Sequence, residues 1–317
     1  MIIRLQGGLG NQLFQYALYL QLEAQGRTVR IDEESGFVSD IQRKPCLNSA
    51  LGIDYEKASD TEIKTLRDAF MDPLSRIRRK LTGRKNKEWE EPDGRFHPEV
   101  LEMDEVYLNG YFQSEAYFPD PGVREKLAGI FKDSINKRLG SENGGAEGQE
   151  QAAEDNAGSR SRELAREIEA SGSSAVSLHI RRGDYLQPGT AETHGGICTD
   201  AYYEKAVSLI LEKVPDAVFY VFSDDPGYAE SWAEDMSVHG GCFIAADPGA
   251  GKVPADADSL LLMRLCRHHI LANSSFSWWG AWPDEGAEDG MIIVPDRWYN
   301  NRADDGIYTD RMQRITC

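Results

Sequence analysis

Two adjacent arginines, Arg181 and Arg182, stand where a predicted buried strand over residues 175–180 ends. The planar guanidinium group of arginine offers paired N–H groups that match the oxygens of a phosphate. Asp184 follows closely enough for its carboxylate to orient one of the two arginines. The pattern predicts either an anion site suited to the phosphates of a nucleotide or an ion-pair cluster that only stabilises the strand end.

A glycine-rich turn over residues 7–10 separates a predicted strand (2–5) from a predicted helix (11–24). Glycines let a ligand approach the backbone, and the first N–H groups of a helix can bind a phosphate. Asp32, at the end of the next predicted strand, adds a partial likeness to a dinucleotide-binding fingerprint, but Leu13 replaces the third glycine of that motif. The turn is therefore interpreted as either a phosphate-binding segment or a structural turn alone.

Hydroxyl and indole side chains are concentrated in residues 273–282, after a predicted short strand. Hydroxyl groups near the start of a helix can cap that helix or bind a phosphate. The three tryptophans of this segment have the spacing of one buried helix face, so we expect core packing for at least two of them.

The metal-binding patterns in the sequence are weak. Asp256 and Asp258 form an Asp-x-Asp pair, which holds a divalent ion in one large class of transferases, but this pair precedes a predicted helix instead of following a strand. Such a pair arises readily by chance in a chain with 53 acidic residues. His268 and His269 lack the spacing of metal ligands. These patterns therefore give little support to a metal site.

Two α/β domains are predicted, joined by an acidic stretch. Residues 141–159 contain five carboxylates, no Lys or Arg and no large apolar side chain, a composition that favours a flexible linker or surface loop. We expect an N-terminal domain over 1–140, the linker over 141–160 and a C-terminal domain over 161–317. The C-terminal domain has predicted helices over 162–170, 201–214 and 259–266, and predicted strands over 175–180, 218–222, 269–272 and 291–294. Polar clusters follow three of these strands, at the sheet edge where parallel α/β proteins bind ligands.

The net charge of −18, from 35 basic and 53 acidic residues, argues against a general nucleic-acid-binding protein. No stretch approaches the length of a membrane span, and the start of the sequence does not resemble a secretory leader. The five cysteines are scattered without a Cys-x-x-Cys pair, which argues against a disulfide framework. We expect a cytoplasmic protein.

A basic amphipathic helix is predicted after Asp72, with Leu74, Ile77 and Leu81 at helical spacing. Basic residues from Arg76 to Lys87 surround this apolar stripe. Such a helix can lie on an anionic membrane, and the alternative is a solvated surface helix. The first interpretation predicts weak peripheral contact with the inner face of a membrane.

Together these motifs resemble the bacterial α-1,2-fucosyltransferases of glycosyltransferase family 11. The resemblance extends from residue 1 to about residue 300, and the acidic stretch is an apparent insertion. It is carried by GGLGNQLFQYA from residue 7, GYFQSEAYF (110–118), HIRRGDY (179–185), FSDDP (222–226) and HHILANSSFSWWGAW (268–282).

The resemblance implies an α/β, GT-B-like fold of two Rossmann-type lobes with a donor cleft between them. It implies an inverting transfer of fucose from GDP-β-L-fucose to the 2-hydroxyl of a galactose-terminated glycan, with no metal ion and no other cofactor required. The basic helix after Asp72 adds the expectation that the acceptor glycan is lipid-linked. Arg181 and Asp184 are the expected catalytic residues. The expected donor-binding residues are Gly8, Gly10, Asn11, His179, Arg182, Ser223, Asp224, Asp258, Asn273, Ser274, Ser275 and Phe276.

The sequence leaves the general base, the acceptor and two other functions open. Candidate bases are Asp184, Glu192, His194 and Asp32. An NAD(P)-binding oxidoreductase would use the first strand–turn–helix unit and Asp32, although the third glycine is missing. A non-catalytic carbohydrate-binding protein would use the tryptophan cluster but would leave the paired arginines unexplained.

Overall fold

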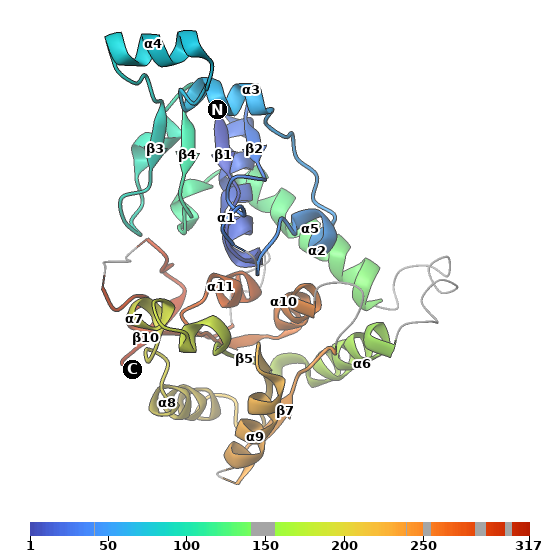
Figure 1. Ribbon diagram of the computed structural model, residues 1–317. Coiled ribbons are helices and arrows are strands. Elements are labelled where there is room, and N and C mark those ends of the chain that lie inside the picture. Colours follow the sequence, from blue (N-terminus) through green and yellow to red (C-terminus); the bar gives the residue numbers. More distant parts are fainter. Residues whose placement is uncertain (41, 141–155, 239, 250–254, 283–289, 302–305) are drawn as a thin grey trace. The chain divides into compact units, whose positions relative to one another are not determined.

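A computed structural model describes residues 1–40, 42–140, 156–238, 240–249, 255–282, 290–301 and 306–317. The chain divides into two compact units (Figure 1). Most of the predicted acidic linker, residues 141–155, lies outside the described residues. The first unit comprises Met1–Asn48, Gly52–Leu127 and Asp305–Ile307, and the second comprises Ser49–Leu51, Ala128–Asp304 and Tyr308–Cys317.

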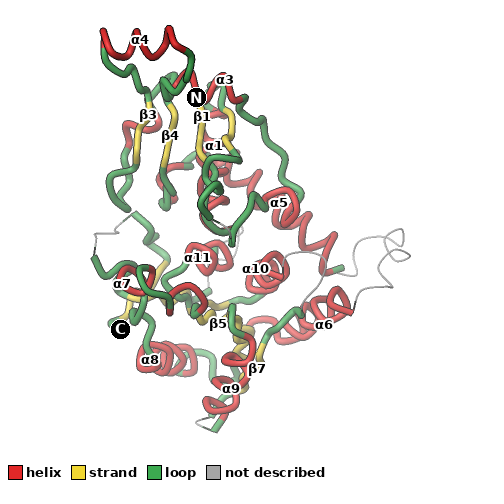
Figure 2. The backbone as a smooth tube through the Cα atoms, viewed as in Figure 1, coloured by secondary structure: helices red, strands yellow, loops and turns green. Residues whose placement is uncertain are grey.

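The first unit contains a sheet of four strands in the order β2-β1-β4-β3 (Figure 2). All neighbouring strands in it are parallel. The predicted strand–helix–strand start is confirmed as β1 (Ile2–Arg4), α1 (Leu9–Ala24) and β2 (Arg30–Asp32). Helix α1 begins earlier than predicted because Gly8 already occupies its N-cap position, so Gly10 lies in its first turn.

The other elements of the first unit follow β2. Strands β3 (Glu88–Glu90) and β4 (Tyr107–Asn109) complete its sheet. The short 3₁₀ turns are η1 (Pro98–Leu101) and η2 (Glu115–Tyr117). The helices are α2 (Leu47–Leu51), α3 (Asp60–Leu66), α4 (Pro73–Thr82) and α5 (Pro121–Leu139), of which α2 and α5 continue into the second unit.

The second unit contains a parallel sheet of six strands in the order β10-β9-β8-β5-β6-β7. The strands are β5 (Ala175–Ile180), β6 (Val218–Ser223), β7 (Cys242–Ala245), β8 (His268–Ile270), β9 (Ile292–Pro295) and β10 (Met312–Ile315). The helices are α6 (Asn156–Ser171), α7 (Thr190–His194), α8 (Asp200–Leu211), α9 (Pro226–Ser237), α10 (Ala255–Leu265) and α11 (Ser275–Ala281), with short turns η3 (Gly172–Ser174) and η4 (Gly183–Leu186). The predicted helices and strands of this half are confirmed, with shifts at their ends.

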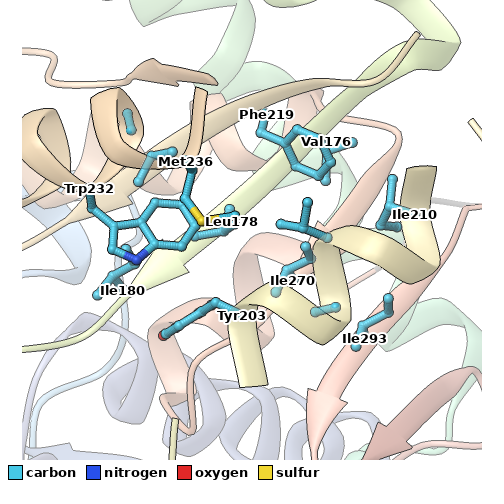
Figure 3. Close-up of a cluster of buried hydrophobic side chains, with 14 of the residues drawn as sticks. Val176, Leu178, Ile180, Tyr203, Ile210, Phe219, Trp232, Met236, Ile270 and Ile293 are labelled. Atoms are coloured by element: carbon cyan, nitrogen blue, oxygen red, sulfur yellow. The ribbon is translucent and has the colours of Figure 1, made fainter. Parts of the chain in front are cut away.

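Alternate residues of β5 face opposite sides of the sheet, and helices cover both sides. Val176, Leu178 and Ile180 pack with α8 and α9 in one apolar cluster (Figure 3). On the opposite side, Ser177 contacts His269 and His179 contacts α11. A strand buried on both faces requires a nearly continuous apolar sequence, which explains the composition of β5 and β6. The expected α/β fold with two Rossmann-type units is confirmed.

No helix in the described part of the chain combines the length and the apolar character needed to cross a membrane.

Candidate functional site

The candidate site of the second unit lies at the carboxyl edge of its sheet. Strands β5 and β6 are parallel and paired in register, with Ile180 opposite Ser223. The residues that follow these strands, Arg181 and Asp224, therefore come to the same edge. The sequence predicted this convergence, and the contacts below confirm it.

Arg181 lies between two carboxylates. Its Nε and Nη2 atoms donate to Oδ1 of Asp184 at 3.1 and 2.7 Å, and its Nη1 atom lies 3.1 Å from Oδ2 of Asp224. Burial disfavours the charged guanidinium group, but Asp224 and Asp184 outweigh that effect and raise the pKa of Arg181 above its ordinary value. A guanidinium group has five N–H groups. The hydrogen bonds to Asp184 use one N–H on Nε and one on Nη2, whereas Nη1 faces Asp224 as an ion pair, so N–H groups on Nη1 and Nη2 lie outside these hydrogen bonds.

Arg182 is held by an aromatic ring and by two carboxylates of the β6 end. Its guanidinium carbon lies 3.7 Å from the centre of the Tyr228 ring, and its Nε atom lies 3.3 Å from Oδ2 of Asp225. Its backbone N–H donates to Oδ1 of Asp224 at 2.8 Å. Asp225 also caps α9 through the backbone N–H of Tyr228, while its own N–H donates to Ser223 Oγ. The two arginines thus share this edge with three carboxylates, so the cluster as a whole is not a simple cationic patch.

Gly183 leaves room for the carboxylate of Asp224 beside the backbone. A Cβ atom on Gly183 would lie 2.2 Å from Oδ2 of Asp224, which no real contact of this kind tolerates. The glycine therefore lets Asp224 approach both Arg181 and the backbone of Arg182.

His179 is a buried neutral residue below this edge. Burial, with a smaller effect from the charge of Arg181, lowers the pKa of His179 to about 3. Its Nδ1 atom lies 2.5 Å from Oγ of Ser277, and its ring centre lies 5.5 Å from that of Phe276. His179 thus connects the end of β5 to α11, the helix that carries the predicted hydroxyl residues.

Asn273 connects three segments through its side chain and backbone. Its Nδ2 atom donates to the carbonyl oxygens of His194 and Trp298, each at 3.1 Å, and its own carbonyl accepts from Tyr185 Oη at 2.8 Å. The amide therefore positions the turn before α11 and does not project from it. Ser274 occupies the N-cap position of α11, with Ser275 and Phe276 in the first turn.

Asp258 contacts helices and lies outside the Arg181 cluster. Its Oδ1 atom accepts from Nε and Nη2 of Arg138 at 2.8 and 2.5 Å, and its Oδ2 atom accepts from Ser161 Oγ at 2.7 Å. These contacts join α10 to α5 and α6. The structure gives Asp258 a packing role, and its predicted contact with the donor stays a prediction.

In the first unit, buried glutamines hold the glycine turn. Gln12 donates to the carbonyl of Gly7 at 2.9 Å, and Gln15 accepts from the Gln6 N–H at 3.0 Å. Gln113 Nε2 donates to Oδ1 of Asn11 at 2.7 Å, which brings the 110–118 motif beside the turn. The sequence analysis did not single out these glutamines, although their positions inside an otherwise apolar helix were a usable signal. Gly8 and Gly10 lie at the start of α1, as described above.

Asp32 is held by its own loop. Its carboxylate accepts from the Ser35 hydroxyl and N–H, from the Glu34 N–H and from Tyr107 Oη. Burial alone would raise the pKa of Asp32, but the hydrogen bonds from Ser35, Tyr107 and Glu34 lower it overall. An ionised carboxylate that accepts four hydrogen bonds is a weak candidate for a general base. The base candidates in the second unit are Asp184, Glu192 and His194. Asp184 pairs with Arg181, Glu192 is exposed, and the ring of His194 stacks on that of Tyr185.

Two units with parallel sheets, one of which carries paired arginines at the carboxyl edge of its sheet, define an α/β protein of the Rossmann type. Residues 150–310 match the family described as Glycosyl transferase family 11, and the chain belongs to this family. It is therefore a glycosyltransferase, as the motifs predicted.

Several curated proteins are similar to the chain. An alpha-1,2-colitosyltransferase of Escherichia coli is 27% identical over 94% of this chain and 92% of its own length. The O-antigen biosynthesis glycosyltransferase WbnK of Escherichia coli is 29% identical over 94% of this chain and 95% of its own length. Mouse galactoside 2-alpha-L-fucosyltransferase Sec1 is 27% identical over 35% of this chain and 28% of its own length.

Solved structures that align with most of the chain have low overall agreement with it. POFUT1 in complex with GDP-fucose is 13% identical over 88% of this chain and 92% of its own, with a TM-score of 0.37. Heptosyltransferase WaaC of Escherichia coli with ADP is 12% identical over 99% of this chain and 92% of its own, also with a TM-score of 0.37.

Proposed function

We propose that the protein transfers L-fucose from GDP-β-L-fucose to the 2-hydroxyl of a terminal galactose, with inversion at the anomeric carbon and without a metal ion. The observation that carries the proposal is the position of Arg181, whose charged group is held at the sheet edge by Asp184 and Asp224. Family membership and the fucosyltransferase activity in the name of the mouse relative support the choice of donor.

In the proposed reaction, the acceptor oxygen forms a bond to the anomeric carbon of fucose from the face opposite GDP. The bond from that carbon to the β-phosphate oxygen breaks, and GDP leaves with the electron pair. The phosphate gains negative charge in the transition state, and a fixed arginine stabilises that charge. The N–H groups of Nη1 and Nη2 of Arg181 that lie outside the carboxylate contacts are the proposed donors to the phosphate.

Asp184 and Asp224 have a positioning role in this proposal. They contact all three nitrogen atoms of the guanidinium group and favour its charged state, so the arginine need not reorganise when the phosphate gains charge. Because Asp184 is engaged by Arg181, we propose that it orients the arginine and that another group accepts the proton of the acceptor hydroxyl.

Gly8, Gly10 and Asn11 are proposed to contact the phosphate and sugar of the donor. The glycines lie at the start of α1, where backbone N–H groups favour an anion, and Gln113 holds Asn11. Arg182, Ser223, Ser274, Ser275 and Phe276 are proposed donor contacts at the carboxyl edge of the second sheet.

A colitosyltransferase is the second candidate, because a relative of that name aligns with almost the whole chain. Colitose is a fucose that lacks the 3-hydroxyl group, so the two donors differ by one hydroxyl. A site that hydrogen-bonds this hydroxyl would strongly reject the deoxy sugar, whereas an apolar pocket would discriminate weakly.

A donor and acceptor screen tests both candidates. The purified chain is incubated with GDP-fucose or GDP-colitose and a panel of galactose-terminated glycans, with and without EDTA, and the product linkage is determined by NMR. An α-1,2-linked fucoside formed equally in EDTA is the expected result. Transfer of colitose alone would replace the first candidate by the second, and a requirement for a divalent ion would contradict metal independence.

Arg181→Ala is the matched test of mechanism, with Arg160→Ala as the control because Arg160 is a surface arginine of α6 paired with Glu163. Loss of one preorganised donor to a developing oxyanion lowers kcat by about 10²–10³. Unchanged turnover in Arg181→Ala would refute the role of Arg181. Thermal stabilisation by NAD(P) and not by GDP would instead favour an oxidoreductase.

A further inference from the structure

The segment 71–87 of the first unit gathers most of the exposed large apolar side chains among the described residues. Seven such side chains are exposed, and four of them lie between residues 71 and 81. Met71 is 69% exposed, Leu74 78%, Ile77 55% and Leu81 79%. Soluble proteins commonly expose single apolar residues, but a cluster of this kind marks an interaction surface.

Three of these residues form a stripe on α4. The helix begins after Asp72, which caps it through the N–H of Ser75, and it ends at Gly83. Leu74, Ile77 and Leu81 have the i, i+3, i+7 spacing that places side chains on one helical face. We call this set the α4 stripe.

Two arginines of α4 anchor the helix to the loop before it. Arg79 donates to the carbonyl oxygens of Asp68 and Phe70 at 3.1 and 2.6 Å, and Arg78 pairs with the Asp68 carboxylate. The same carboxylate accepts from the backbone N–H of Lys85 at 2.8 Å. These bonds hold α4 against the loop before it, with the α4 stripe exposed. Figure 2 shows α4 at the end of the first unit where β3 and β4 begin.

The charge around the stripe is opposite to that of the whole chain. Residues 71–87 contain seven basic side chains and one acidic side chain, whereas the chain has a net charge of −18. Arg76 and Lys80 are exposed on α4, and Lys85 is exposed just after it. Arg78 and Arg79 serve as anchors. Arg84 donates to the carbonyl oxygen of Arg67, and Lys87 pairs with Glu105. Arg76, Lys80 and Lys85 are therefore the cations proposed to face a partner.

We propose that α4 docks on an anionic phospholipid bilayer, with the α4 stripe in the acyl boundary and Arg76, Lys80 and Lys85 at the headgroups. A short helix with an apolar stripe and flanking cations has the chemistry of an interfacial helix. Anionic lipid attracts juxtamembrane cations, and the apolar stripe supplies a second, salt-insensitive contribution. The proposal concerns where the enzyme works and does not depend on the identity of the sugar donor.

Co-sedimentation of the full-length chain with vesicles tests the proposal. Phosphatidylcholine vesicles with and without phosphatidylglycerol are compared at low and high salt. We expect binding that requires phosphatidylglycerol and weakens as salt rises. Failure to bind phosphatidylglycerol vesicles at low salt would overturn the proposal, as would equal binding to both lipid compositions.

Two variants separate the charge from the stripe. Arg76→Gln/Lys80→Gln should weaken binding about 25-fold, because each cation near an anionic surface contributes about fivefold. The charge-matched control is Lys205→Gln/Lys213→Gln, whose parent side chains are exposed on the second unit. Leu74→Gln/Ile77→Gln/Leu81→Gln should abolish sedimentation, and its control is Val38→Gln, at a residue that is 82% exposed.

Thermal unfolding checks that all variants fold, since every replaced side chain is exposed. Binding that survives in both α4 variants would refute the proposal. Analytical ultracentrifugation tests the competing explanation, in which the α4 stripe joins two copies of the chain. A dimer that only the triple glutamine variant dissociates, together with no vesicle binding, would assign the α4 stripe to a second copy of the chain instead.

Discussion

The Nη2 atom of Arg181 donates a hydrogen bond of 2.7 Å to Oδ1 of Asp184, three residues later in the chain. The Nε atom of the same arginine reaches the same oxygen at 3.1 Å. Asp184 therefore fixes one edge of the guanidinium group, and Asp224 approaches its Nη1 atom from the end of the neighbouring strand. The orientation of Arg181 depends on both carboxylates, and this dependence can be measured.

Asp184→Asn should lower kcat by roughly tenfold to a hundredfold, because it removes the charge that holds a catalytic donor in place while keeping a hydrogen-bond acceptor. Steady-state kinetics with GDP-fucose and a galactoside acceptor measure the change. For a positioning residue, the shape of the pH–rate profile stays the same and the effect resembles a weaker version of Arg181→Ala. Disappearance of the acidic limb of the profile would instead identify Asp184 as the general base.

Gly183→Ala should cause a comparable loss of activity without loss of folding. The new methyl group would come within 2.2 Å of Oδ2 of Asp224, so Asp224 must move away from Arg181. Activity assays and thermal unfolding of the same preparation measure the two effects separately. Gly129→Ala is the control, because nothing lies within 4 Å of its added Cβ atom in α5. Full activity in Gly183→Ala would show that Asp224 is not needed to hold the arginine.

Asp258→Ala should reduce stability and leave the KM for the donor unchanged. Its carboxylate joins α10 to Arg138 and Ser161, and both charged side chains are less than one-fifth exposed. Removal of one partner from a largely buried ion pair leaves the other charge without an opposite charge. At this exposure, the free energy of unfolding should fall by about 2 kcal/mol. Urea unfolding gives the stability and donor titration gives the KM. An increase in KM with unchanged stability would restore the predicted donor contact.

Stability should fall between pH 6.5 and pH 5.5, most of all because of His179 and His269, the two buried histidines whose pKa falls to about 3. Burial lowers the pKa of both His179 and His269 to about 3, from the ordinary histidine value of 6.5. As the pH falls below 6.5, the unfolded chain takes up protons that the folded chain does not, so stability is greatest above this pH and declines toward the folded pKa. Each histidine should contribute a loss of about 1 kcal/mol over that pH unit.

The histidine prediction is tested by urea unfolding at both pH values. His179→Asn and His269→Asn should each be less stable than the parent but should show a shallower decline with pH, because Asn keeps a polar group near the Nδ1 position without titrating. His97→Asn, at a partly exposed residue of the first unit, is the control. An identical pH slope in the parent and both buried variants would contradict the neutral state of these histidines.

Local sequence patterns were sufficient for most elements of the second sheet. The apolar run of β6 and the glycine turn before α1 are read from neighbouring residues, because burial on both faces and tight turns impose composition directly. Helix α5 was not predicted. Its buried residues Val123, Leu127 and Phe131 recur at every fourth position, a helical spacing that was a usable signal.

The sequence by itself determined the family, the parallel α/β fold and the position of the paired arginines at a strand end. Each of these follows from contiguous residues. The tertiary structure decided which carboxylates act with which arginine. Asp224 reaches Arg181 because β5 and β6 pair in parallel register, and Asp258 is drawn to Arg138 by helix packing. Asp184 is near enough in the sequence for spacing to indicate it as a partner of an arginine. In a chain with 53 acidic residues, the distant partners Asp224 and Asp258 depend on long-range packing, which spacing along the sequence does not encode.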